Sequence, residues 1–521
     1  LIHAFHLSQP SASTPTGTNW LDEVWAILPQ HLAKKTYGLV DQADFLMDGT
    51  PTLQDVRIRK TISNPTLAEE TKLWRSVLVV PYRNGRGMIA IDVTDPFAPY
   101  VRWEIDNKRH CWADTAAETA KCKTYDAGSD ASDYRNLGNT QGRARIGTVF
   151  VKDTNTNTNQ EVAAVFFGCG DNVVGDAIAP DNGKCFMVAR LDTGHKIKEF
   201  KNGDGSVLKP FKAGHNTDTL DFDIVGDPAV YNTFVGTLVS RAFVGDEGGQ
   251  LWRVDVSSTD VTKWKMSLLF DVYDNTLNTE TLASAKRAPL RSAPAMSPVA
   301  QRGQLALVFG SSTETGNSVS TSQTVVFSIK EKLAVDGTVT SDVLWQKQLQ
   351  TGENLTSKPL IFGRVAYFTS YKPEATDACK GGEGRIWGLD FIRSKGTKEA
   401  IGSLDADGDA KTTGDTVEYI SLADSIPSGI SLVARPACSG NQGVSGATGG
   451  GGASNLGGDS ALKSSKAGQL ELVVQTGNTG QSNAAAKPAK GAAARVNKFA
   501  LKVARPAKQV VSISWGQVQN L

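Results

Sequence analysis

A short strand pattern recurs along the chain and constrains its fold more than any other feature. Each copy is an alternating run of apolar residues that usually follows Gly and ends near Asp, and several copies follow a second apolar run. Period-2 alternation predicts β-strands, and the Gly-containing segment between paired runs predicts a hairpin turn. The copies lie at residues 85–95, 183–194, 248–256, 324–330 and 384–391, with similar runs at residues 1–7 and 496–503.

Repeated hairpins need an arrangement that protects the edges of their sheets. Radial repetition does this, and units that recur about seven times with long insertions between them fit a propeller. We therefore predict an all-β protein, a single β-propeller domain over residues 1–521 with about seven blades. The strand-like ends further predict that the two termini share one blade and close the ring. A stacked pair of β-sandwiches is the structural alternative.

Two segments lack the blade pattern. Residues 439–460 are rich in Gly and Ser with almost no apolar anchor, and residues 483–494 are rich in Ala, Lys and Pro. Such compositions are typical of solvated loops, and the first segment is expected to be flexible. Docking of a partner is the alternative role for either loop.

The start of the chain does not look like a targeting signal. Its first residues alternate like a strand, and the chain does not begin with Met. We therefore expect further sequence upstream of residue 1 in the native gene product. No stretch approaches the roughly 18 apolar residues of a membrane-spanning helix, so no transmembrane segment is predicted.

The six cysteines indicate the compartment. Cys111 and Cys122 bracket one short polar segment, and Cys169 and Cys185 bracket another. Local pairs that close polar loops, with no CxxC motif, favour disulfides in an oxidising compartment over a metal site. We predict the pairs 111–122, 169–185 and 379–438 in a periplasmic or extracellular protein. Six reduced thiols in a cytosolic protein are the alternative.

Charge and motif content exclude several functions. The 55 Lys and Arg residues nearly balance 54 Asp and Glu residues, so no basic excess predicts binding to nucleic acid. No nucleophile elbow, Walker A loop or Rossmann fingerprint occurs in a suitable setting. Trp252 and Trp387 lie within predicted strands, where blade packing explains them. A quinone-dependent dehydrogenase or a hydrolase is the enzyme alternative.

An acidic loop carries the clearest chemical signal. Asp405, Asp407 and Asp409 alternate along one tight loop, where their carboxylates can converge on one point. Three crowded carboxylates need a countercharge, and hard oxygen donors suit Ca²⁺. We therefore predict a calcium site here, and a merely polar turn is the alternative. Asp246, which precedes a Gly pair, is instead expected to brace a hairpin turn.

The rest of the predicted calcium shell would come from the second half of the loop. A backbone carbonyl of Lys411 and oxygens of Thr413 or Asp415 could complete it. The loop is not a standard EF-hand, because Ala410 and Thr416 replace the usual Gly and Glu. The flanking sequences read as strands, so we expect the loop to join two strands of a blade.

Two segments of the chain follow longer motifs. WRSVLVVPYRNGRGMIAIDVTDP is similar to W-R-(T/S)-V-L-V…G-R-G…A-L-D-V-T-D-P, and FVGDEGGQLWRVDV is similar to A-G-D-x-x-G-x-L-W-(R/K)-F-D. In these motifs the sequence resembles the PilC/PilY family of type IV pilus tip and biogenesis proteins. The opening LIHAFHL and the segments FLMDGTPTLQDV, RAPLRSAPAMSPV and LVFGSSTETG also match, in the family's order. The matches run from residue 1 to about residue 393.

The resemblance implies a modified propeller at the C-terminal end of a larger protein on the pilus tip. It implies calcium-dependent control of pilus extension and retraction, adhesion to host or abiotic surfaces, and contact with minor pilins. The family's D-x-(D/N)-x-D-x-x-x-D loop lies just before its A-G-D segment, whereas here the comparable loop starts at Asp405 and has Thr413 at its ninth position.

These observations together predict a noncatalytic surface module. It would be a calcium-bound, disulfide-linked propeller in the fimbrium, passing through the periplasm or outer membrane in transit. Contacts to partners would use the insertions, since variable loops carry binding surfaces. A lectin-like propeller that binds glycans is a further alternative.

Overall fold

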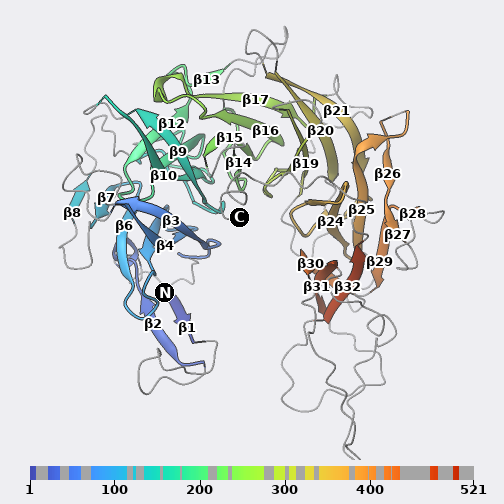
Figure 1. The fold of residues 1–521 in the computed structure, drawn as a ribbon, viewed down its shortest axis with the longest axis horizontal. Coiled ribbons are helices and arrows are strands. Elements are labelled where there is room, and N and C mark those ends of the chain that lie inside the picture. Colours follow the sequence, from blue (N-terminus) through green and yellow to red (C-terminus); the bar gives the residue numbers. More distant parts are fainter. Residues whose placement is uncertain are drawn as a thin grey trace, which may run out of the picture. The chain divides into compact units, whose positions relative to one another are not determined.

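The computed structural model is built almost wholly from β-strands (Figure 1). Its helical elements, such as α1 (Gln30–Ala33) and a 3₁₀ turn at Val261–Lys263, are short. The predicted all-β class is confirmed. The structure describes residues 1–6, 21–33, 35, 46–59, 72–113, 121–124, 134–152, 157–176, 179–208, 220–232, 238–274, 287–299, 304–312, 323–333, 339–374, 382–396, 398–405, 416–423, 425–434, 470–478 and 497–503.

The described residues form two compact units. The first holds those up to Val343, and the second holds those from Leu344 onward. Whether both units belong to one propeller domain over residues 1–521 stays a prediction. Of the helices that the structure describes, none has the length and apolar character needed to span a bilayer.

The first half of the first unit contains a hairpin and two larger sheets. The hairpin pairs β1 (Ile2–Phe5) with β2 (Glu23–Ile27). The β3–β8 sheet follows chain order and comprises β3 (Thr52–Arg59), β4 (Lys72–Pro81), β5 (Gly87–Asp92), β6 (Tyr100–Asp106), β7 (Arg109–Trp112) and β8 (Lys121–Thr124). The β9–β12 sheet comprises β9 (Arg145–Lys152), β10 (Asn159–Gly168), β11 (Cys185–Arg190) and β12 (Lys196–Lys201).

Two more sheets follow in the first unit. The β13–β17 sheet comprises β13 (Val207–Leu208), β14 (Ala229–Asn232), β15 (Val239–Gly245), β16 (Gln250–Asp255) and β17 (Lys265–Asp271), with β13 parallel to β17. The β18–β21 sheet comprises β18 (Ala295–Pro298), β19 (Leu305–Gly310), β20 (Val325–Leu333) and β21 (Val339–Gln348). The last strand continues into the second unit.

The second unit holds three further sheets. The β22–β29 sheet comprises β22 (Asn354–Leu355), β23 (Leu360–Phe362), β24 (Val365–Lys372), β25 (Glu383–Ser394), β26 (Ala400–Gly402) and β29 (Tyr419–Ala423). A small pair joins β27 (Leu404–Asp405) to β28 (Thr416–Val417). The third is a meander of β30 (Ser425–Ala434), β31 (Leu470–Asn478) and β32 (Asn497–Val503).

Most of these sheets are meanders, in which each strand pairs antiparallel with the one before it. The repeated segments of the sequence form β5, β11, β16, β20 and β25, so the hairpin prediction is confirmed at all five. Meanders of four or more strands are the units from which propeller blades are made. The number of blades stays a prediction.

The described terminal runs do not share a sheet, contrary to the prediction that the termini complete one blade. The N-terminal strand β1 pairs with β2, and the C-terminal strand β32 pairs with β31 in a different sheet. Each end finds a partner nearby in the sequence, and closing a short loop costs less conformational entropy than joining two distant ends.

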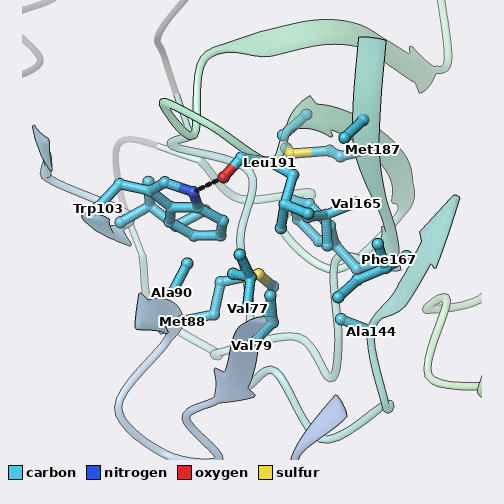
Figure 2. Packing of buried hydrophobic residues seen from close by; sticks show 14 of the residues in the cluster. Val77, Val79, Met88, Ala90, Trp103, Ala144, Val165, Phe167, Met187 and Leu191 are labelled. Carbon is cyan, nitrogen blue, oxygen red and sulfur yellow. Dashed lines mark hydrogen bonds between the residues drawn. The ribbon is translucent and has the colours of Figure 1, made fainter. Parts of the chain in front are cut away.

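Alternation along the strands builds the core of the first unit. One face of the β3–β8 sheet packs on the β9–β12 sheet, with Val77, Val79 and Trp103 against Val165 and Phe167 (Figure 2). The indole Nε1 of Trp103 donates a 2.7 Å hydrogen bond to the carbonyl oxygen of Leu191. This bond satisfies the polar atom of a fully buried side chain, as burial requires.

The opposite face of the β3–β8 sheet is covered by the N-terminal segment. Val80 and Ile89 on this face pack with Ile2, Ile27 and Leu32. The alternate residues of β4 therefore serve two different cores, as the pleat of a strand dictates.

Candidate functional site

The predicted calcium loop begins and ends on a pair of short strands. In the β27–β28 pair, Leu404 lies opposite Val417 and Asp405 lies opposite Thr416. The antiparallel pairing brings the two ends of the acidic segment together. The expectation that this segment joins two strands is therefore confirmed.

The predicted ligands themselves lie almost wholly outside the described residues. Asp405 is the last residue of β27, and the structure describes its backbone but not its side chain. Calcium coordination therefore stays a prediction. Among the described residues, no three His, Cys, Asp or Glu side chains are placed to hold a metal ion. The remaining predicted ligands, all outside the described ranges, are Asp407, Asp409, Lys411, Thr413 and Asp415.

A glycine on β25 anchors both strands of the loop. The amide of Ser403 donates to the carbonyl of Gly388 at 2.9 Å, and the amide of Gly388 donates to the carbonyl of Glu418 at 3.0 Å. A Cβ at Gly388 would lie 2.5 Å from Cδ2 of Leu404, which is only 1% exposed. The missing side chain thus lets Leu404 enter the core immediately before Asp405.

The carboxylate of Glu418, which follows β28, pairs with Lys347 on β21. Its Oε2 lies 2.5 Å from Nζ of Lys347, and the two side chains are each about a quarter exposed. The same Nζ lies 5.4 Å from the ring centre of Trp387, within the range of a cation–π contact. These contacts balance the charge of Glu418 without help from the acidic loop.

A buried polar cluster supports this sheet from within. The indole of Trp387 donates a 2.7 Å hydrogen bond to Oγ of Ser370, which in turn donates to a carboxylate oxygen of Glu353. The other oxygen of Glu353 accepts a 2.9 Å bond from Arg385, whose guanidinium lies 4.6 Å from the ring centre of Tyr419. Sequence reasoning missed this cluster, because Glu353 stands in a turn that has no motif of its own.

Asp246 braces the β15–β16 turn, as predicted. Its Oδ1 accepts bonds from the amides of Gly248 at 2.9 Å and Gln250 at 2.8 Å, and its Oδ2 accepts one from Trp252 Nε1 at 2.9 Å. Burial raises the pKa of this carboxyl to about 7, against the lowering effect of these three bonds. Both Trp252 and Trp387 are buried and hydrogen-bonded, which agrees with the prediction that they pack the blades.

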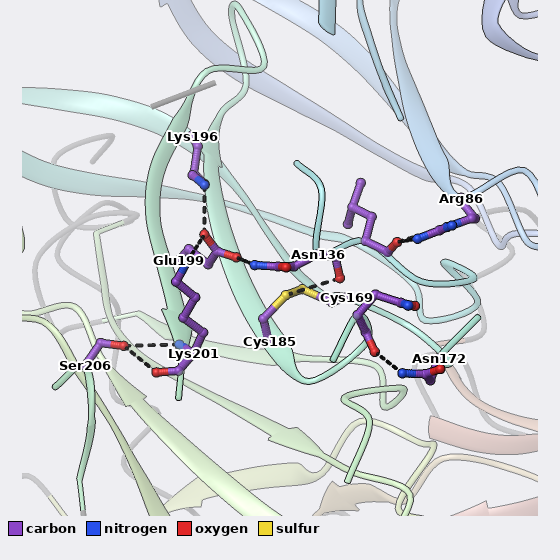
Figure 3. The surroundings of a disulfide bond; sticks show 11 residues. Arg86, Asn136, Cys169, Asn172, Cys185, Lys196, Glu199, Lys201 and Ser206 are labelled. Carbon is purple, nitrogen blue, oxygen red and sulfur yellow. Dashed lines mark hydrogen bonds and ion pairs between the residues drawn. A yellow bond between two sulfur atoms is a disulfide. The ribbon is translucent and has the colours of Figure 1, made fainter. Parts of the chain in front are cut away.

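Two of the three predicted disulfides are confirmed. Cys111 bonds to Cys122 across the facing strands β7 and β8, and Cys169 bonds to Cys185 (Figure 3). Cys169 and Cys185 are buried in the core of the first unit, where they close a polar segment. Within this segment Asn182 bonds to Val173 and Ala179. The pair 379–438 lies outside the described residues and stays a prediction.

Comparison with known proteins places these features in context. No family model matches the sequence. Over 257 residues the chain is 26% identical to a type IV pilus biogenesis factor PilY1 homolog of Xylella fastidiosa (strain Temecula1 / ATCC 700964). The matched part is 48% of this chain and 15% of that protein, so the chain spans a small part of this relative.

The fold resembles a solved structure over nearly its whole length. The crystal structure of the Pseudomonas aeruginosa PilY1 C-terminal domain superposes with a TM-score of 0.50 at 14% identity, covering 83% of this chain and 88% of that one. Together with the sequence similarity to the Xylella fastidiosa protein, this fold similarity confirms the predicted resemblance to the PilY family. The β-propeller class is confirmed with it, since the PilY1 domain is a β-propeller.

The departure from the PilY calcium pattern has a structural counterpart. In the resemblance described above, the acidic calcium loop is expected just before the A-G-D segment, which here ends at Asp246. The described residues of that stretch instead form β14 and β15, paired with each other from Ala229 opposite Phe243 to Asn232 opposite Val239. Residues 228–245 hold no Asp or Glu, so the loop at Asp405 is the candidate calcium loop of this chain.

Proposed function

We propose that this chain is a noncatalytic propeller module of a type IV pilus protein. It acts at the pilus tip, where it supports pilus assembly, extension and retraction, and adhesion to a host or abiotic surface. The observation that carries the proposal is the sequence similarity to the Xylella fastidiosa PilY1 homolog, named a type IV pilus biogenesis factor. The fold similarity to a PilY1 C-terminal domain supports it.

Two disulfides in one chain support a location outside the cytoplasm. Thiols remain reduced in the cytosol, whereas bridges such as Cys111–Cys122 persist in the periplasm and on the cell surface. The chain would therefore cross the periplasm or outer membrane before it reaches the pilus tip. Minor pilins are the partners that we expect there.

Calcium is the proposed cofactor, bound by the loop at Asp405. Asp405, Asp407 and Asp409 are the main proposed ligands, and Lys411, Thr413 and Asp415 supply the remaining oxygens. The support is chemical, since alternating carboxylates in one loop need a cation between them. The β27–β28 pair and Gly388 hold the ends of the loop, so a bound ion would stiffen it against a fixed base.

Calorimetric titration tests the calcium site. After chelation, the wild-type chain is titrated with Ca²⁺ and with Mg²⁺, and so are Asp407→Ala and the control Asp181→Ala, whose side chain is 81% exposed elsewhere. We expect saturable heat with Ca²⁺ for the wild type and the control, and loss of that heat in Asp407→Ala. Equal heat in all three proteins would remove this assignment.

A genetic experiment tests the pilus role separately. The gene is replaced in its own host by a version that lacks the codons for this chain, and surface pili, twitching and surface attachment are counted. We expect fewer surface pili and weaker attachment, restored by the intact gene. Normal piliation would contradict the proposal.

A bound organic cofactor after purification would point to an enzyme, and glycan binding that survives Asp405→Ala would point to a lectin.

A further inference from the structure

A cavity of about 830 Å³ lies between the β1–β2 hairpin and one face of the β3–β8 sheet. One wall is β1, which contributes Ile2 and Ala4, and the other wall includes Leu78 and Val80 of β4. The volume lies within the range of sites that bind small organic ligands. We refer to this cavity as the hairpin slot.

The slot is held open by contacts at its margin. The indole Nε1 of Trp25 on β2 donates a 2.9 Å hydrogen bond to the carbonyl of Pro96, which follows β5. The ring of His6 stacks on that of Phe97 with centroids 6.1 Å apart. These two contacts tie the hairpin to the sheet, so the slot does not depend on a ligand for its shape. A preformed cavity costs less to occupy than one that must be ordered on binding.

Apolar side chains of the slot remain in contact with water. Phe5 is 52% exposed and Leu53 is 60% exposed, although both line the cavity. The opposite face of the same sheet is packed against the β9–β12 sheet. Apolar surface that is concentrated in one concave place marks a binding site, because covering it removes the area from water.

The charges at the slot are paired within the protein. Asp48 at the margin bonds to Arg83 at 2.8 Å, and His3 bonds to Glu23 at 2.7 Å. Lys and Arg side chains are missing from the described lining. An anionic head beside Asp48 would therefore meet a like charge and gain no Lys or Arg counterion from the described lining, whereas a neutral hydroxylated head would meet no repulsion.

We propose that the hairpin slot binds a neutral single-chain amphiphile, such as a monoacylglycerol. The acyl chain lies between the two layers of strands, against Leu53, Leu78 and Phe97, and the head remains at the open side near Asp48. A slot between two layers suits a linear chain. The affinity comes from burial of apolar surface, so it is insensitive to salt and carries a negative heat-capacity change.

Calorimetry with the full chain tests the proposal, with monolaurin below its micelle concentration as the probe. We expect saturable binding with one site per chain and no dependence on ionic strength. Laurate, which has the same chain and a charged head, is expected to bind about tenfold more weakly. Vesicles of a neutral diacyl lipid serve as the third ligand and are not expected to bind. Tighter binding of laurate, or binding to vesicles alone, would overturn the proposal.

Variants locate the bound probe. Ala4→Trp fills the slot from β1 and is expected to abolish binding. Leu53→Ser alters an exposed wall residue, so it leaves folding intact and weakens binding by roughly tenfold. Trp74→Ala is the matched control, because Trp74 is 65% exposed but lies outside the lining. Unchanged affinity in Leu53→Ser, or equal loss in Trp74→Ala, would refute the assignment to the slot.

Discussion

The indole Nε1 of Trp252 donates a 2.9 Å hydrogen bond to Oδ2 of Asp246, and both side chains are fully buried. Three N–H groups donate to the carboxylate of Asp246. The side-chain NH2 of Asn at this position would face at least one of these donors, so at least one hydrogen bond would be lost. We expect Asp246→Asn to lower the free energy of unfolding by about 1–3 kcal/mol. Urea unfolding followed by tryptophan fluorescence measures this loss.

The pH dependence of the same pair gives a second readout. Burial raises the pKa of Asp246 to about 7 in the folded chain, against about 3.9 in an unfolded chain. Between these values the unfolded state releases the proton and the folded state keeps it, so this group's contribution to stability falls as pH rises. The stability of wild type relative to Asp246→Asn should therefore decrease from about pH 4 to pH 7. A difference that is constant with pH would contradict this assignment.

A buried carboxylate that contacts two guanidinium groups in the first unit gives the next prediction. Oε2 of Glu331 lies 2.5 Å from Nη1 of Arg241, and Oε1 lies 2.6 Å from Nε of Arg253. Glu331 is 1% exposed, so Glu331→Gln would remove the buried negative charge that both guanidinium groups contact, although Arg253 also lies 3.0 Å from Asp255. We expect a loss of about 3–5 kcal/mol in the free energy of unfolding.

A surface pair on the same sheet provides the control for Glu331. Asp342 pairs with Lys332 at 2.5 Å, but both side chains are nearly half exposed. Asp342→Asn should change the free energy of unfolding by less than about 1 kcal/mol, because water screens the pair. Equal losses in the two variants would show that burial does not set the strength of these pairs.

These two sites show what the sequence could reveal and what it could not. The bonds of Asp246 reach residues two, four and six positions away, so the Gly-rich turn after it was enough to predict the brace. The partners of Glu331 lie 78 and 90 residues away, and only the pairing of sheets brings them together. Local alternation likewise predicted β5, β11 and β16. It could not predict which strand pairs with β1, because several strands compete for that edge and local alternation does not distinguish between them.

The Cys169–Cys185 bridge is predicted to be the more important of the two described disulfides for stability. Its sequence separation is 16, against 11 for Cys111–Cys122, and both of its sulfurs are buried, whereas Cys122 is exposed. We expect Cys169→Ala with Cys185→Ala to cost about 3 kcal/mol. Urea unfolding of the two double variants measures the order, and mass spectrometry of unreduced peptides tests the pair 379–438. A larger loss in the variant without Cys111 and Cys122 would reverse the order.

His110 is predicted to make the chain sensitive to acid. Its Nε2 donates a 2.7 Å bond to the carbonyl of Thr193, and the side chain is fully buried. Burial, and then the nearby His195, lower the pKa of His110 to about 3. Below its ordinary pKa of about 6.5 the unfolded state takes up a proton that the folded state does not, so stability falls as pH drops from 6.5 toward 3.

The variant His110→Gln tests this, because it keeps a donor for Thr193 but does not titrate. Its thermal unfolding midpoint should fall less than that of wild type between about pH 7 and pH 4.5. The control is Trp74→Ala, since the side chain of Trp74 is 65% exposed, carries no titratable group and should leave the wild-type pH dependence unchanged. Parallel pH profiles for wild type and His110→Gln would contradict the prediction.

The contact between Gly388 and Leu404 links the fold to the candidate calcium loop. A Cβ at position 388 would lie 2.5 Å from Leu404 Cδ2, so Gly388→Ala must displace the residue that precedes Asp405. We expect a loss of about 1–3 kcal/mol in the free energy of unfolding, as overpacking of a core produces. The matched control is Gly429→Ala on β30, where an added Cβ meets no atom within 4 Å.

If the loop binds calcium, calorimetry should find weaker binding in Gly388→Ala alone, since only that change disturbs the strands from which the loop starts. Equal calcium affinity in the two variants, with Gly388→Ala clearly destabilised, would mean that calcium binding does not depend on the packing of the β27–β28 pair.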